Sequence, residues 1–259
     1  MDDLCEVNVG LVSGENRFFL MNESVVRARG LEKDMCPVIS RTDELPGIRF
    51  TDGDWKIQAD TGRDVYLFLP GDRPLCDLDP AARIYIAWGE ARHMQKGYKC
   101  RARKHWYSIP ASWIGDAFLT RHASQYPRMI LNAAGTYVTD SLHKVRFHPG
   151  VCAEAVTAAY LNTYTLALSE TLGRSYGGGV LIFEPGEARR MRIPMSGAGR
   201  LDIEMIDRLQ RDGRIGDILS YTDQVLLRDG LGLDQTDIAR LHAVWDTLRD
   251  RRLSRRKIR

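Results

Sequence analysis

The sequence lacks the features that mark membrane, secreted and zinc-binding proteins. No apolar run approaches the roughly 18 residues that a membrane helix needs, and the acidic start Met1-Asp2-Asp3 is not followed by the apolar stretch of a secretory signal. The five cysteines are dispersed and form no Cys-x-x-Cys pair, which favours reduced thiols over a disulfide framework. We therefore expect a cytoplasmic protein that does not bind a membrane.

The residue patterns of several catalytic sites are also missing. There is no His-x-x-x-His or His-x-His pair of a metal site, and no serine lies in a Gly-x-Ser-x-Gly turn. The run Tyr176-Gly177-Gly178-Gly179 could cradle a nucleotide, but a cradle follows a strand and opens a helix, whereas this run precedes an expected strand. We predict a structural turn there, and no catalytic residue, metal ligand or cofactor site in this chain.

Charge is partitioned along the chain more strongly than the net charge of +3 suggests. Residues 90–148 carry ten Lys or Arg against three Asp or Glu, whereas residues 1–89 carry ten against sixteen. No acidic residue occurs between Ala91 and Gly115, where cations are interleaved with Trp106 and Tyr107. Cations displace counterions from phosphates, and rings stack on bases, so this segment predicts a nucleic-acid-binding surface. The alternative is a solvated strand face that binds nothing.

The basic tail at residues 249–259, with seven Lys or Arg against one Asp, has two interpretations. It could add phosphate contacts, or it could be a solubilising helix end whose cations suit the helix dipole.

Turn residues divide the first 150 residues into short segments. A hairpin-like connection is expected at Ser13-Gly14-Glu15-Asn16. Asp79-Pro80 predicts a helix start, and Gly97 its end. Strands are expected at 7–12, 17–21, 65–69, 106–109, 117–119, 128–132 and 142–147.

Helical patterns dominate the rest of the chain. We expect a helix over 151–172 that ends at a left-handed Gly173, a strand at 180–183, and a short basic helix from Pro185. After glycines at 197 and 199, three more helices are expected at 203–209, 215–227 and from Asp234 to 248. The sequence thus predicts an α+β fold, with a mixed, strand-rich module over 1–198 and a helical C-terminal appendage over 199–259.

Six segments carry a family resemblance. They are VGLVSGENRFF at 9–19, PVISR at 37–41, KCRARKHWYSIP at 99–110, SLHKVRF at 141–147, GRSYGGGVL at 173–181 and RIP at 192–194. Together they resemble the C-terminal target-recognition region of gamma-class, TaqI-like N6-adenine DNA methyltransferases of restriction-modification systems. The resemblance covers about residues 5–195.

The resemblance also implies what this chain does not contain. Such enzymes hold the extruded adenine with an Asn/Asp-Pro-Pro-aromatic loop and bind S-adenosylmethionine at a glycine-rich loop after the first strand. This sequence has no Pro-Pro dipeptide and no glycine loop in that position. The resemblance therefore implies a non-catalytic specificity module that binds double-stranded DNA. Its second partner would be an adenine methyltransferase domain, N-terminal or in a separate chain, that binds S-adenosylmethionine.

On this hypothesis, cationic and polar side chains of the basic region contact phosphates or bases. The candidates are Lys99, Arg101, Arg103, Lys104, Tyr107, Arg121, Arg128, Ser141, His143, Lys144 and Arg146. Two alternatives stay open: a protein-interaction subunit that docks a separate methyltransferase or nuclease, and a nuclease with an unrecognised site.

Overall fold

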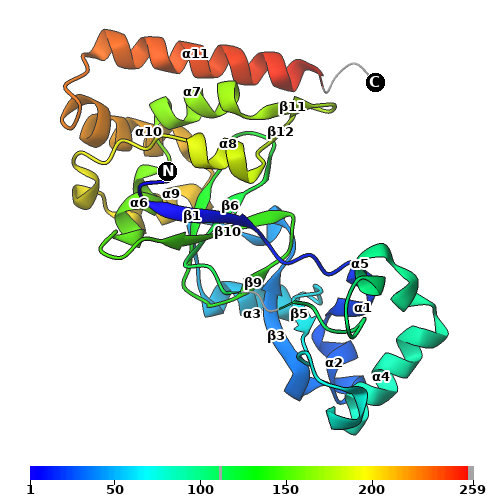
Figure 1. Ribbon diagram of the computed structural model, residues 1–259. Helices are drawn as coiled ribbons and strands as arrows, with labels where there is room; N and C mark the ends of the chain where they lie inside the picture. The colour runs from blue at the N-terminus through cyan, green and yellow to red at the C-terminus, as the bar shows by residue number, and fades with distance from the viewer. Residues whose placement is uncertain (111–112, 256–259) are drawn as a thin grey trace.

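A five-stranded sheet organises the first of two bodies in the computed structural model (Figure 1). The structure describes residues 1–110 and 113–255. The strand order is β1 (Cys5–Val9), β10 (Leu142–Phe147), β6 (Ala117–Thr120), β8 (Met129–Asn132) and β4 (Arg49–Phe50). Neighbours are antiparallel except β4 and β8. The sheet therefore pairs residues 5–9 with residues 143–147.

The C-terminal helices complete the core of this first body. Successive strand side chains point to opposite faces, and Val7 and Val145 share one apolar core with Ile206, Ile218 and Trp245. The helices are α6 (Ala153–Ala159), α7 (Thr163–Leu172), α8 (Pro185–Arg190), α9 (Ile203–Arg211), α10 (Ile215–Asp223) with a π-helical extension (Gln224–Arg228), and α11 (Gln235–Ser254). Residues 199–255 are helical, as the sequence predicted, and they pack into the core of the first body.

The second body is built on a four-stranded sheet with an aromatic core. The strand order is β2 (Leu20–Met21), β5 (Tyr66–Phe68), β3 (Met35–Ile39) and β9 (Tyr137–Val138). The helices of this part are α1 (Asn16–Phe19), α2 (Glu23–Arg29), α3 (Asp52–Asp60), α4 (Pro80–Ala91) and α5 (Tyr98–Arg101). In the core, Phe18 stacks on Tyr85 with ring centroids 4.7 Å apart. A separate apolar cluster, which includes Phe118 of β6 and Ile39 of β3, joins the two sheets.

A small third sheet carries a projecting hairpin. Its strands are β11 (Arg174–Tyr176), β12 (Val180–Ile182) and β7 (His122–Ala123), and the β11–β12 hairpin runs beside α11 (Figure 1). Short helical turns lie at Glu32–Asp34, Thr42–Glu44, Leu75–Asp77, Met94–Lys96 and Ala198–Arg200. The α+β class predicted from the sequence is confirmed. Among the described helices, none has the length and apolar character needed to span a membrane.

Two predictions of helix starts are confirmed in atomic detail. The Asp79 side chain accepts a hydrogen bond from the backbone N–H of Ala81, with Pro80 in the first helical position. The Asp234 side chain accepts in the same way from the N–H of Asp237. Capping by Asp satisfies backbone donors that the first helical turn leaves unpaired, which is why the local sequence is sufficient here.

Other local predictions are wrong because distant contacts decide the structure. Residues 16–19 form α1, and β1 pairs with β10 while β2 pairs with β5, so no hairpin joins the first two strands. The helix expected to end at Gly97 ends at Ala91, and Gly97 precedes α5. The expected strand at 106–109 lies outside the sheets.

The long helix expected at 151–172 is divided. The Asn162 side chain accepts from the N–H of Thr165 and so caps a new helix, α7, after α6 has ended at Ala159. Gly173 has a φ of −71°, an ordinary extended conformation instead of the predicted left-handed one.

Candidate nucleic-acid interface

The basic segment folds into short helical turns at the edge of the second body, with α5 beside the chain that leaves β1 (Figure 1). α4 ends at Ala91, and His93 adopts a φ of 61°, a left-handed conformation that is uncommon for residues other than glycine. The turn at 94–96 then packs against both α4 and α5. The cations are therefore presented from helical turns, and not from the solvated strand face of the alternative interpretation.

Five cations of this segment are exposed, and we call them the basic surface: Arg92, Lys96, Lys99, Arg101 and Lys104. Within the described part of the chain, none of them forms an ion pair. Their positive charge is consequently not neutralised by the protein itself. Three of the predicted DNA contacts, Lys99, Arg101 and Lys104, belong to this surface.

An aromatic stack supports one edge of the basic surface. The Trp88 ring stacks on Tyr85 at 5.3 Å, and the guanidinium groups of Arg29 and Arg92 each lie 4.3 Å from the Trp88 ring centroid. Attraction between a cation and the ring face holds each guanidinium in place while leaving it accessible. The sequence signal for this contact is the spacing of Trp88 and Arg92, four residues apart on a helix.

Arg103 was predicted to contact DNA, but the structure gives it an internal role. Its Nη2 donates to the Val12 carbonyl at 2.8 Å, and its guanidinium lies 5.5 Å from the Phe19 ring centroid. Burial lowers the pKa of Arg103 below its ordinary value. This side chain therefore ties the segment after α5 to the chain leaving β1.

Tyr107, also predicted to contact DNA, is buried in this structure. It is 4% exposed, and its hydroxyl donates to the Arg73 carbonyl at 2.8 Å. The ring stacks on His105 and belongs to the aromatic core of the second body. A buried ring of this kind stabilises the support of the basic surface instead of meeting a ligand.

The candidates on the five-stranded sheet and beside it are mostly committed to internal partners. Arg121 donates to the Asp140 carbonyl at 2.9 Å and pairs with Glu184 at 2.8 Å. Arg128 donates to the carbonyls of Gly47 and Thr42. These arginines hold segments of the fold together, so neither is free to bind a phosphate in this conformation.

The polar candidates His143 and Ser141 are internal as well. His143 is fully buried, its Nε2 donates to the Phe183 carbonyl at 2.7 Å, and burial lowers the pKa of the ring. The Ser141 hydroxyl donates to the Ser40 carbonyl.

Lys144 and Arg146 form a second basic site with a tryptophan that the sequence analysis had not selected. Both side chains lie on the same face of β10, two residues apart. The Trp113 ring centroid is 4.3 Å from the Lys144 Nζ and 4.2 Å from the Arg146 guanidinium carbon. Arg146 is exposed, so this pair remains on the surface, with an aromatic ring beside it.

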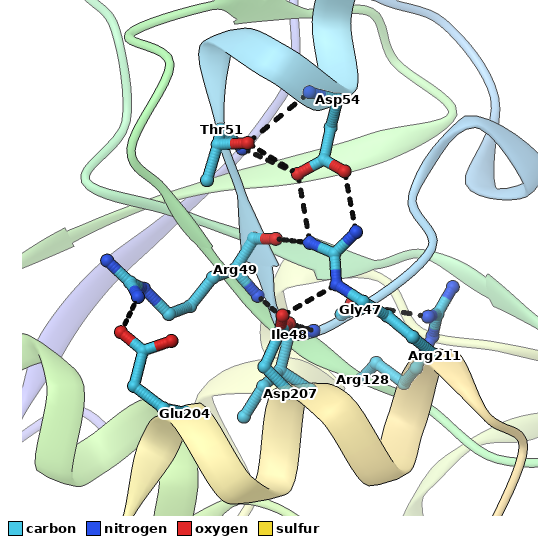
Figure 2. A network of polar contacts seen from close by, with 9 residues as sticks. All are labelled: Gly47, Ile48, Arg49, Thr51, Asp54, Arg128, Glu204, Asp207 and Arg211. Carbon is cyan, nitrogen blue, oxygen red and sulfur yellow. Dashed lines mark hydrogen bonds and ion pairs between the residues drawn. The ribbon is translucent and has the colours of Figure 1, made fainter. Parts of the chain in front are cut away.

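The two bodies are locked together by a network around Arg211 of α9 (Figure 2). Arg211 contacts both Asp54 oxygens, at 2.6 and 2.9 Å, and Asp207 at 2.6 Å. Asp207 in turn accepts from the backbone N–H groups of Ile48 and Arg49. Burial alone would raise the pKa of Asp54, but the Arg211 guanidinium holds that pKa below its usual range. The network fixes how the second body, with its basic surface, sits on the first.

The glycine run at 177–179 does not form a cradle for S-adenosylmethionine. The three glycines at 177–179 connect β11 to β12 in a hairpin, so they do not lie between a strand and a helix N-terminus. Across residues 1–110 and 113–255, no group of three or more His, Cys, Asp or Glu side chains could hold a metal ion.

Comparison with known proteins identifies the family. The C-terminal domain of the Type II methyltransferase M.Eco57I, as a protein family, matches residues 1–227. The chain belongs to this family. The match runs past residue 198 and includes α9 and α10, in agreement with the shared core of the first body. The resemblance to the C-terminal region of restriction-modification methyltransferases is confirmed.

Two curated relatives are similar over most of this chain. Type II methyltransferase M.XamI of Xanthomonas campestris pv. amaranthicola is 24% identical over 197 residues, which cover 75% of this chain and 36% of that protein. Type II methyltransferase M.AccI of Acinetobacter calcoaceticus is 24% identical over 208 residues, covering 78% and 36%. The chain thus spans little more than a third of the length of these relatives.

A solved structure shares the fold. The type IIG restriction endonuclease BpuSI is similar over 97% of this chain and 30% of its own, with a TM-score of 0.54 and 12% sequence identity. This chain therefore shares its fold with about a third of that protein.

Proposed function

We propose that this chain binds double-stranded DNA and recognises the target sequence of an adenine-N6 methyltransferase. The observation that carries the proposal is the basic surface, whose five exposed cations have no acidic partner among the described residues. Family membership supplies the biological setting, because the family is named for the C-terminal domain of a methyltransferase. A concentrated, unneutralised positive surface in such a domain is suited to the phosphate backbone.

The division of labour between phosphate and base contacts follows from the geometry. Flexible exposed lysines act as point charges and suit phosphates. Contacts to phosphates position the domain on the duplex but do not distinguish one base sequence from another. Arg92 and Arg101 add planar guanidinium groups, which can bind a guanine edge through two hydrogen bonds worth about 1–3 kcal/mol of discrimination. Arg146, beside Trp113 on β10, is a further candidate for base contacts.

Methyl transfer itself would be carried out by another part of the enzyme. That part, N-terminal to this domain or in a separate polypeptide, would bind S-adenosylmethionine and the extruded adenine. When bound there, S-adenosylmethionine supplies the methyl group. This chain would hold the duplex in register, which requires that the basic surface and the methyltransferase part contact the same DNA.

The test is the salt dependence of duplex binding by this chain. Neutralising about five phosphates predicts a log-log slope near −4.5, at roughly −0.9 per phosphate. The triple variant Lys99→Gln, Arg101→Gln, Lys104→Gln should make that slope shallower by about 2.7, to about −1.8. Selection of bound oligonucleotides at two salt concentrations would then show whether a sequence is preferred.

A matched control neutralises three exposed arginines of the first body, with the substitutions Arg190→Gln, Arg192→Gln and Arg208→Gln. It should leave the slope unchanged, since these residues lie away from the basic surface. A flat salt dependence of the unmodified chain, or equal effects of both triple variants, would contradict the proposal. Absence of DNA binding together with tight capture of a methyltransferase part would favour the interaction-subunit alternative.

A further inference from the structure

The tip of the β11–β12 hairpin is an exposed element that the proposed function does not yet use. All three residues of β11 are exposed, and the Tyr176 side chain at its end is 53% exposed. The strands pair Tyr176 with Val180, so Gly177, Gly178 and Gly179 form the connecting loop. In Figure 1 this hairpin extends beside the end of α11.

The three glycines do not have the same reason to be glycine. Gly178 and Gly179 have φ values of +81° and +74°, which side chains rarely adopt, so the turn requires them. Gly177 has no such φ, and a Cβ built there would meet nothing within 4 Å. The fold therefore does not demand glycine at 177. A bare main chain at an exposed tip allows close approach of a ligand.

The hairpin is anchored rigidly on α11 by Arg252. This side chain is 3% exposed and pairs with both oxygens of Glu170, at 2.8 and 2.6 Å. It also donates to the carbonyls of Gly179, Ser124 and Gln125. A Cβ at Gly179 would lie 3.1 Å from the Arg252 carbonyl oxygen, so the loop packs directly on the helix backbone. These contacts hold the Gly179 end of the loop against α11.

The end of α11, which packs against this loop, carries two cations without acidic partners among the described residues. Arg251 and Arg255 are exposed, and no ion pair forms at either one in the described portion of the chain. The Arg255 Nη1 donates to the Ser175 hydroxyl at 3.3 Å, which places this cation against β11, next to Tyr176. The neighbouring Arg249, by contrast, is paired with Asp246 and Asp250.

We infer that the hairpin tip and the end of α11 form a second contact to the DNA backbone, separate from the basic surface. The inference rests on the proposed function, because both sites would bind one duplex. Exposed guanidinium groups suit phosphates, an exposed ring suits the sugar or an unstacked base, and the bare Gly177 lets the main chain come close. The ligand chemistry is therefore a phosphodiester backbone.

The experiment compares two kinds of variant in duplex binding by the full chain. Arg251→Gln with Arg255→Gln should make the log-log salt slope shallower by about 1.8, at roughly 0.9 for each lost phosphate contact. Gly177→Val should weaken affinity about ten-fold at every salt concentration without changing the slope, because it obstructs approach and removes no charge.

Gly216→Val is the matched control. Gly216 is an exposed glycine of α10 with ordinary φ and open space around its Cβ position, so affinity should stay at the original value. Thermal unfolding of Gly177→Val should match that of the unmodified chain, since the new side chain meets no protein atom.

Failure of this inference can be distinguished from failure of the proposed function. If Gly177→Val and the double arginine variant bind like the unmodified chain while the Lys99, Arg101, Lys104 variant does not, the hairpin contact is wrong and the basic surface stands. If the unmodified chain does not bind duplex DNA, both are wrong. Normal DNA binding with lost association to a methyltransferase part would also overturn the inference, because the hairpin would then contact protein.

Discussion

Arginine has two different roles in this protein, one inside the first body and one on the basic surface of the second. In the first body Arg121, Arg211 and Arg252 each combine a carboxylate with backbone carbonyls and so join segments far apart in sequence. On the basic surface of the second body, Arg92 and Arg101 have no carboxylate partner among the described residues. The residue type is the same, and the supply of nearby acids decides whether its charge is used inside the fold or left for a ligand.

The comparison predicts its largest stability effect at Arg252. Arg252→Ala should lower the free energy of unfolding by about 3–5 kcal/mol, because the buried Glu170 carboxylate loses its counter-charge. Urea unfolding measures the change. The adjacent Arg251→Ala, at an exposed position, should change stability by less than about 0.5 kcal/mol. Similar losses for both variants would mean that the internal and external arginines are not distinct.

Substitutions in the basic surface should instead weaken duplex binding and leave the unfolding stability nearly unchanged. Lys99→Gln, Arg101→Gln, Lys104→Gln together should weaken duplex binding about 100-fold near 0.15 M salt, equivalent to about 2.7 kcal/mol, since three phosphate contacts are lost. Unfolding stability should remain within about 0.5 kcal/mol of the original, because these three exposed side chains form no ion pair or side-chain hydrogen bond among the described residues. Fluorescence anisotropy with a duplex, read beside a urea titration, tests both halves of the statement.

Arg211 tests the connection between the bodies, with a smaller effect. Arg211→Met should cost about 2 kcal/mol, since Asp54 and Asp207 lose a cation that is itself about one-third exposed. Because the folded-state pKa of Asp54 is lowered, its contribution is present above the unfolded pKa of about 3.9 and is lost as pH falls through the folded value.

The stability difference between Arg211→Met and the original chain should therefore shrink below about pH 4. Denaturant midpoints at pH 3 and pH 7 provide the measurement. A difference that stays constant across that range would show that the Asp54 pair is not what the substitution removes.

Tyr107 provides the smallest and most specific test. Tyr107→Phe removes only the hydroxyl that donates to the Arg73 carbonyl, so stability should fall by about 1 kcal/mol. Duplex affinity should not change, because the ring is buried below the basic surface. A clear loss of affinity without loss of stability would return Tyr107 to the DNA-binding residues.

How much the sequence could predict depended on how far apart the deciding contacts lie. Helix starts at Asp79 and Asp234 depend on a cap within three residues, and they were predicted correctly. The strands expected at 117–119 and 142–147 are also present, as β6 and β10. In these cases, the residues that determine the local structure lie within a few positions of one another in the sequence.

The candidate site was only partly predictable for the converse reason. Arg251 and Arg252 are neighbours of identical type, yet one is exposed and the other buried, because Glu170 lies beside only the second. Arg103 and Lys104 also differ in exposure. Arg103 is partly buried and donates to the Val12 carbonyl, whereas Lys104 is exposed. The charge density of the sequence predicts the basic region. No local sequence pattern, however, distinguishes an arginine that is exposed to a phosphate from one that binds carbonyls or carboxylates of the protein itself.

The pairing of β1 with β10 has a consequence for biosynthesis. Within these residues β1 is synthesised first, and it cannot pair with β10 until residues 143–147 have left the ribosomal exit tunnel. During that interval Val7 and Cys5, both buried in the finished sheet, have no partner strand. Contacts of such long sequence separation slow folding and leave nascent chains open to aggregation. Expression yield should accordingly be sensitive to translation speed and chaperone supply.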